Sequence, residues 1–185
     1  YWQELMFGDG FDVIPDPKNS RYGYGMSQQG SVGRYDRETG ATKGIRPTHP
    51  DPDVKLRFNW NSAIAMNPTD QETIYFGSQF VHKSTDQGHT WNIISPDLTT
   101  NNKDKQRQFE SGGITMDATG AENHCTIFTI GESPIDENVI WVGTDDGNVQ
   151  VTVDGGKTWK NVTQNISGVP ANTWTYHIEP SSHDV

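Results

Sequence analysis

The sequence predicts an all-β protein, and three observations lead to this fold class. The chain of 185 residues contains 19 Gly but only three Leu, a composition that does not suit a helical bundle. Its apolar stretches are short, rich in β-branched and aromatic side chains, and separated by Gly, Asn and Asp turns, as in antiparallel strands. Two segments, 73–91 and 139–159, also match each other closely. A repeat built from short strands indicates a repetitive β architecture.

The spacing of the repeat predicts a β-propeller. A degenerate copy of the repeat lies earlier in the chain, and a fourth copy begins near its end. Each copy opens with an apolar stretch that ends in proline, and these landmark residues are Pro15, Pro68, Pro134 and Pro180, spaced 53, 66 and 46 residues apart. Three or four short strands in a repeat of this length are typical of one propeller blade.

The blades are assigned in chain order. We expect three four-stranded blades at approximately 8–50, 58–100 and 124–168, and an incomplete fourth at 173–185. Propellers need about four to eight blades to close a ring. We therefore expect the chain to be a fragment of one larger partial propeller, whose remaining blades lie on the same or another chain.

Two turns of the repeat share the pattern S/T-x-D-x-G-x-T-W. An Asp in a tight turn accepts backbone N–H groups, Gly takes the positive φ that the turn needs, and Trp packs under it. This pattern resembles the Asp-box, or bacterial neuraminidase repeat, which joins the third and fourth strands of a blade. We expect its residues to be structural: Ser84, Asp86, Gly88, Thr90 and Trp91, and Thr152, Asp154, Gly156, Thr158 and Trp159.

The turns at the opposite face carry the candidate binding residues. Turns between the second and third strands, and the segments between blades, would meet near the propeller axis. A long insertion at 97–107 and 112–113 falls on the same face, where functional loops accumulate. Amide, cationic and aromatic side chains there suit a sugar or a peptide, and the candidates are Gln28, Gln79, Arg57, Asn59, Trp60, Asn61, His124 and Trp174.

Beyond the two boxes, the chain resembles the sortilin-type propeller proteins of bacteria, which are often labelled glycosyl hydrolases. The residues that carry this resemblance are Gly8–Phe11, Arg34–Gly40, Leu56–Ser62, Ser95–Thr99 and Val142–Val151. The resemblance implies export to the periplasm, cell surface or medium, and a ligand bound by the propeller. It predicts an exported module that binds a polypeptide or a glycan on the face opposite the boxes.

The alternative is a glycoside hydrolase of the Asp-box type. The turn Thr144–Gly147 resembles the one in which inverting xyloglucanases place a catalytic Asp, whereas the first blade carries Gln28 at the equivalent position. Glycoside hydrolysis uses two carboxyl groups. Asp145 and Asp9 are the candidates in this chain, with any further catalytic acid lying outside it.

Composition excludes some partners. The formal net charge of −10 opposes a nucleic-acid footprint, and no apolar run is long enough to span a membrane. The six His show no paired metal spacing, and no cofactor motif is present. Calcium at 145–148 is only a weak hypothesis, because the remaining ligands of a calcium loop are missing.

Overall fold

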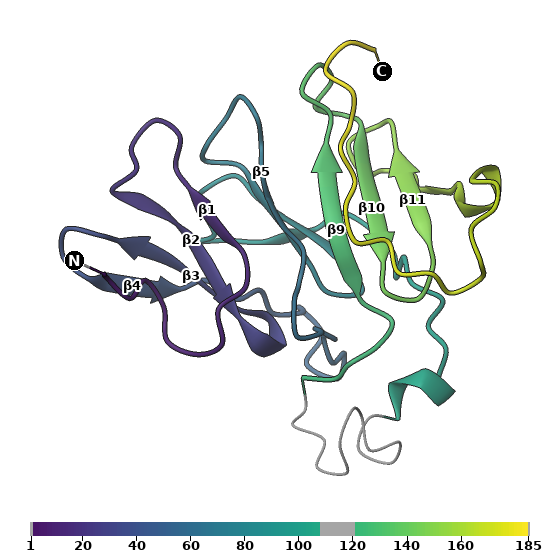
Figure 1. Ribbon diagram of the computed structural model, residues 1–185, viewed down its shortest axis with the longest axis horizontal. Coiled ribbons are helices and arrows are strands. Elements are labelled where there is room, and N and C mark those ends of the chain that lie inside the picture. Colours follow the sequence, from purple (N-terminus) through teal and green to yellow (C-terminus); the bar gives the residue numbers. More distant parts are fainter. Residues whose placement is uncertain (1, 108–120, 185) are drawn as a thin grey trace.

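Three antiparallel sheets of four strands each make up the protein (Figure 1). The computed structural model describes residues 2–107 and 121–184. In every sheet the strands pair in chain order, each with the next. The sheets are blade 1, with strands Val13–Pro15 (β1), Tyr22–Ser27 (β2), Ser31–Asp36 (β3) and Ala41–Gly44 (β4); blade 2, with Ile64–Met66 (β5), Ile74–Gly77 (β6), Val81–Ser84 (β7) and Asn92–Ile93 (β8); and blade 3, with Ile127–Glu132 (β9), Ile140–Thr144 (β10), Val149–Thr152 (β11) and Lys160–Asn161 (β12).

The all-β prediction and the partial propeller are confirmed by this architecture. Short 3₁₀ turns are the helical elements of the described residues, at Gln28–Gly30 (η1), Asp104–Gln106 (η2) and Thr163–Asn165 (η3). No helix in the described part of the chain is long and apolar enough to cross a membrane. Of the predicted insertion, residues 112–113 lie outside the described residues.

Strand β6 shows why the blades stack face to face. Alternate side chains of a strand point to opposite faces of its sheet. Ile74 and Phe76 join a cluster of buried side chains shared with blade 1, whereas Tyr75 joins a second cluster shared with blade 3. Both faces of blade 2 are therefore buried, which explains why this strand is apolar throughout instead of alternating with polar residues.

A glycine near the end of the second strand lets the next blade approach closely. A Cβ atom on Gly77 would lie 2.8 Å from Cγ2 of Ile127, the first residue of β9. A Cβ atom on Gly143 would lie 2.4 Å from Cγ2 of Thr175. Thr175 therefore packs against the second strand of blade 3 in the same position that Ile127 takes against the second strand of blade 2. Residues 173–180 follow the path of a fourth inner strand, although they form no ladder of their own.

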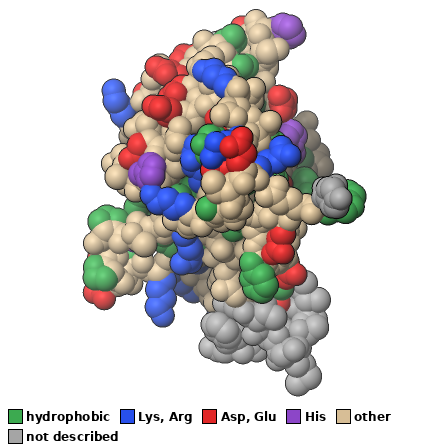
Figure 2. Space-filling view, turned by 90° about the vertical axis from the view of Figure 1, so that its left-hand side faces the viewer, with side chains coloured by type: hydrophobic (Ala, Val, Ile, Leu, Met, Phe, Trp, Pro, Cys, Tyr) green, Lys and Arg blue, Asp and Glu red, His purple; other side chains and the backbone are tan. Residues whose placement is uncertain are grey.

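The inner strands surround a central cleft. Residues of β1, β5 and β9, together with residues 176–180, line a cavity of about 430 Å³. In Figure 1 the C-terminal segment, drawn in yellow, runs across β9. The outer surface of blade 1 carries charged side chains of both signs (Figure 2). Because the first strand of every blade lines the cleft, the cleft lies where a propeller has its axis.

Candidate binding site

Each blade uses a side chain one or two residues beyond the end of its second strand to hold the segment that leads into the blade. That side chain is an amide in blades 1 and 2 and a carboxylate in blade 3. In all three cases its oxygen accepts a backbone N–H from the lead-in segment, which has no ladder partner at that point. The pairs are Asp9 with Gln28 (3.2 Å), Arg57 with Gln79 (2.8 Å) and Thr126 with Asp145 (2.8 Å).

Gln79 is more deeply engaged than the sequence suggests. Its side chain is 2% exposed, and its amide nitrogen donates a hydrogen bond to the carbonyl of Lys55 at 3.0 Å. Gln28 is half-buried and holds Asp9 in the same way. Both glutamines are predicted ligand contacts, and the hydrogen bonds of their side chains that the structure shows are internal to the protein.

Asp145 joins blades 2 and 3 from a fully buried position. Its Oδ2 accepts hydrogen bonds from Asn59 Nδ2 at 2.9 Å and from Thr126 Oγ1 at 2.8 Å. Burial raises the pKa of the Asp145 carboxyl, and the donors around it act in the opposite direction. Asn59 is itself buried, and its Oδ1 accepts the backbone N–H of Trp60 at 2.7 Å. Asp145 and Asn59 therefore form an internal clamp.

The two candidate catalytic carboxyl groups differ in their exposure to solvent. Asp145 has no exposed surface, whereas Asp9 is exposed on the lead-in segment of blade 1. A glycosidase needs two carboxyl groups that both reach the scissile bond.

Arg57 anchors the insertion rather than projecting into solvent. Its Nε donates to the carbonyl of Cys125 at 3.0 Å, and its Nη2 donates to Asp97 Oδ2 at 2.7 Å and Thr99 Oγ1 at 3.2 Å. The guanidinium thereby connects the lead-in segments of blades 2 and 3 to the start of the insertion.

Asp146 is also used within the fold. Its oxygens accept hydrogen bonds from Thr144 Oγ1 at 2.6 Å and from the backbone N–H and hydroxyl of Thr100, both at 2.7 Å. Burial alone would raise the pKa of Asp146, but these donors outweigh it and lower the pKa. Within residues 2–107 and 121–184 there is no group of three or more His, Cys, Asp or Glu that could hold a metal ion. The contacts of Asp145 and Asp146 oppose their use as calcium ligands.

Three polar atoms near this clamp are buried without a hydrogen-bond partner in the described part of the chain: Trp60 Nε1, Asn61 Oδ1 and His124 Nε2. Their segments are adjacent, because Asn123 Nδ2 donates to the carbonyl of Phe58 at 2.8 Å. His124 Nδ1 lies 3.7 Å from Asp145 Oδ2. Leaving a buried donor or acceptor unpaired costs about 1–3 kcal/mol, so such atoms call for a partner beyond the described residues.

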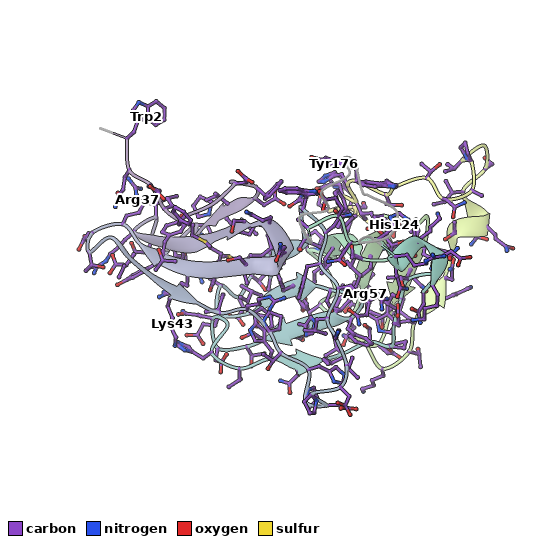
Figure 3. All side chains as sticks on the ribbon, turned by 90° about the horizontal axis from the view of Figure 1, so that it is seen from below. Trp2, Arg37, Lys43, Arg57, His124 and Tyr176 are labelled. Atoms are coloured by element: carbon purple, nitrogen blue, oxygen red, sulfur yellow. The ribbon has the colours of Figure 1, made fainter. Side chains whose placement is uncertain are left out.

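Aromatic rings continue from these atoms into the central cleft. The ring of Trp174 lies 6.1 Å from that of His124 and 5.3 Å from that of Phe128, and Phe128 lies 5.7 Å from Tyr176. Trp174 is 50% exposed and Tyr176 is 73% exposed. Asn61, Phe128 and Tyr176 line the cleft itself. We call Trp60, Asn61, His124, Phe128, Trp174 and Tyr176 the mouth cluster; Figure 3 shows His124 and Tyr176 on one side of the molecule, far from Trp2.

Phe128 and Tyr176 are not among the site residues that the sequence predicts, because both lie in apolar stretches that predict strands. Their position in the sequence could have indicated them. Phe128 follows the predicted site residue His124 by four positions, and Tyr176 follows Trp174 by two. Residues of an inner strand that face the axis contribute to the cleft as well as to the sheet.

The turns at 84–91 and 152–159, here called the repeated turns, have the same internal bonding. In the first, Asp86 accepts the N–H and hydroxyl of Thr90 at 2.8 and 2.7 Å, and Ser84 Oγ donates to Asp86 at 2.7 Å. Asp154 has equivalent bonds to Thr158 and Thr152. Donors from Thr90 and Thr158 lower the pKa of each carboxyl to about 2.

Each repeated turn also ties its blade to the preceding one. Trp91 Nε1 donates to the carbonyl of Ile45 at 2.7 Å, and Trp159 Nε1 donates to the carbonyl of Ile94 at 2.9 Å. Ile45 and Ile94 directly follow the outer strands β4 and β8. The repeated turns lie at the other end of the third strands from the mouth cluster, because adjacent strands are antiparallel.

Comparison with known proteins supports the fold. No protein family matches the sequence, and no curated protein does so either. A GH74 enzyme of Niastella koreensis superimposes with a TM-score of 0.50 at 18% identity, over 90% of this chain and 22% of that chain. The corresponding values are 0.49, 14%, 91% and 31% for the GH74 xyloglucanase of Xanthomonas campestris, and 0.49, 13%, 83% and 39% for YCF48 bound to D1 peptide. The chain thus spans well under half the length of these proteins. The first, at a TM-score of 0.50 and 18% identity, supports the fold alone.

Proposed function

We propose that this chain is part of an exported propeller module that binds a polypeptide or a glycan through the mouth cluster. The observation that carries the proposal is a set of three buried polar atoms without a partner among residues 2–107 and 121–184. They lie beside exposed aromatic rings, at the opening of the central cleft. Buried polar atoms are normally paired, and a ligand that displaces the side chains covering these atoms would supply the missing partners.

The chemistry of these atoms indicates the class of ligand. Trp60 Nε1 can only donate a hydrogen bond, Asn61 Oδ1 can only accept one, and His124 Nε2 does either according to its tautomer. Sugars and peptide backbones offer both donors and acceptors at short spacing. Trp174 and Tyr176 add ring surface against which a sugar face or an apolar side chain can pack.

The finer identification rests on the sequence pattern together with the bonding of the repeated turns. We infer that these turns are Asp-boxes with a structural role, a reading supported by their matching internal bonds and by the Trp91 and Trp159 bonds to the preceding blade. Export and the sortilin-like character follow from the resemblance in the sequence. Further blades, on this or another chain, would complete the ring.

A glycoside hydrolase is the competing function. The burial of Asp145 and the three donors on its carboxylate oppose direct contact with a substrate. If the protein is a binding module, Asp145 contributes to its stability. If it is a hydrolase, the Asp145 carboxyl group has to reach a glycosidic oxygen.

A binding panel with matched variants tests the proposal. The intact protein is titrated with xyloglucan, β-glucan and sialoside oligosaccharides and with a peptide library, beside Trp174→Ala and Trp2→Ala. We expect Trp174→Ala to weaken binding at least tenfold and Trp2→Ala to leave it unchanged, because Trp2 is fully exposed and distant from the mouth cluster.

Two results would overturn the proposal. One is the absence of binding to every member of the panel by folded protein; the other is equal affinity of Trp174→Ala and the parent. Reducing-sugar release that disappears in folded Asp145→Asn would establish the hydrolase instead.

A further inference from the structure

A second cleft lies at the seam between blades 1 and 2, on the side of the repeated turns. It has a volume of about 350 Å³ and is lined by residues 43–46 and Thr48 of blade 1 and by residues 88–91 of the first repeated turn. Its lining includes three basic side chains, Lys43, Arg46 and His89, but no carboxylate. Such a lining is unusual in a chain with a formal net charge of −10.

The two strongly basic side chains of this cleft have no carboxylate partner among the described residues. Neither Lys43 nor Arg46 forms an ion pair there. Lys43 Nζ instead contacts His89 Nδ1, which brings side chains of two blades together. The Arg46 guanidinium lies 4.8 Å from the centre of the Phe58 ring, and its side chain is exposed. Asp86, in the same turn as His89, interacts with it electrostatically but does not line the cleft. Cations gathered around a cleft raise the local concentration of anions.

The seam between blades 2 and 3 provides an internal comparison. Ile94 takes the place of Ile45 there, because each accepts the indole N–H of the following repeated turn. Lys43 and Arg46 flank Ile45 at the same offsets at which Asn92 and Ser95 flank Ile94. His89 lies two residues before Trp91, and Lys157 lies two residues before Trp159. The same backbone arrangement therefore carries three basic side chains at the first seam and one at the second.

We propose that the first seam is a binding site for a sulfate or phosphate group. Lys43 and Arg46 would donate charge-assisted hydrogen bonds to the oxyanion, and an N–H of His89 would add a further donor from the facing blade. The group is either a free ion or a substituent of a larger molecule such as a sulfated saccharide. The site is separate from the mouth cluster, since Lys43 lies at the edge of blade 1, away from His124 and Tyr176 (Figure 3).

Isothermal titration calorimetry of the intact protein tests this site. Inorganic sulfate and inorganic phosphate are titrated at constant ionic strength set with sodium chloride, beside Lys43→Gln, Arg46→Gln and Lys157→Gln. We expect saturable binding that weakens at least fivefold in each of the first two variants and is unchanged in Lys157→Gln. All three side chains are exposed, so the variants should keep the parent melting temperature.

A pair of disaccharides separates the two sources of the oxyanion. Tighter binding of a sulfated disaccharide than of its unsulfated form, lost in Lys43→Gln, supports a group carried by a glycan; tighter binding of the inorganic ion supports a free anion. The proposal is overturned if neither ions nor sulfated disaccharide bind above the chloride reference. It is also overturned if Lys157→Gln weakens binding as much as Lys43→Gln.

Discussion

Asp145 and its partners connect two blades through side-chain atoms alone, and this gives the residue a measurable structural role. Asp145→Asn should lower the free energy of unfolding by about 1–3 kcal/mol, because the amide replaces one of the oxygens that accept bonds from Thr126 and Asn59. Urea denaturation measures the change. Asp9→Asn is the control, since Asp9 is exposed and should have little effect. Equal stability of Asp145→Asn and the parent would contradict the clamp.

His82 makes the stability of the protein depend on pH. It is fully buried between Ser78, whose Oγ lies 2.8 Å from its Nε2, and the ring of Trp91. Burial lowers the pKa of His82 from 6.5 to about 4, with His49 as a further positive neighbour. The unfolded chain therefore binds a proton that the folded chain rejects between these two pH values. Stability should be complete above about pH 6.5 and fall as the pH drops to about 4, by on the order of 3 kcal/mol.

Denaturation at a series of pH values measures this effect against His82→Gln. The glutamine does not titrate, so the variant should lose most of the fall in stability between pH 6.5 and 4. His183→Gln is the matched control, because His183 is exposed and should leave the pH dependence intact. An unchanged pH dependence in His82→Gln would show that other groups cause it.

At the scale of elements, close approach of adjacent blades depends on the glycine at the end of the second strand. Gly77→Ala should cost about 1–3 kcal/mol of unfolding free energy, since the added methyl group would meet Ile127 and Ala63 at 2.8 and 3.1 Å. Gly44→Ala in β4 is the control, because nothing lies within 4 Å of its Cβ position. Thermal and urea unfolding should separate the two variants. Similar stabilities would mean that the blades adjust without cost.

The elements also show what sequence patterns can and cannot predict. The bonding of Asp86 and Asp154 is local, within four residues along the chain, so a short motif is sufficient to identify the turn. Gln79 behaves differently: its partners Arg57 and Lys55 are 22 and 24 residues away. From the sequence, an amide in a polar turn predicts a ligand contact. Its internal hydrogen bonds cannot be predicted, because they depend on which distant segment the fold places beside it.

At the scale of the whole molecule, the four inner segments converge on one cleft, and the polar and aromatic residues of three of them meet at its mouth. The repeat in the sequence was sufficient to predict the blades and the end of the sheets at which Trp60, His124 and Trp174 lie. The repeat could not predict the hydrogen bond between Asn59 and Asp145, since 86 residues separate them. The atoms left without partners emerge only after such internal pairs are known.

The most direct test of the account follows the indole N–H of Trp60 by nuclear magnetic resonance. Six tryptophans give six indole signals, which single substitutions to Phe assign. The tightest-binding member of the panel is then titrated into the intact protein. The Trp60 signal should shift strongly, because its N–H gains a partner, while those of Trp91 and Trp159 should stay, because both already donate to backbone carbonyls. A bound ligand that leaves the Trp60 signal in place would contradict a binding site at the mouth of the cleft.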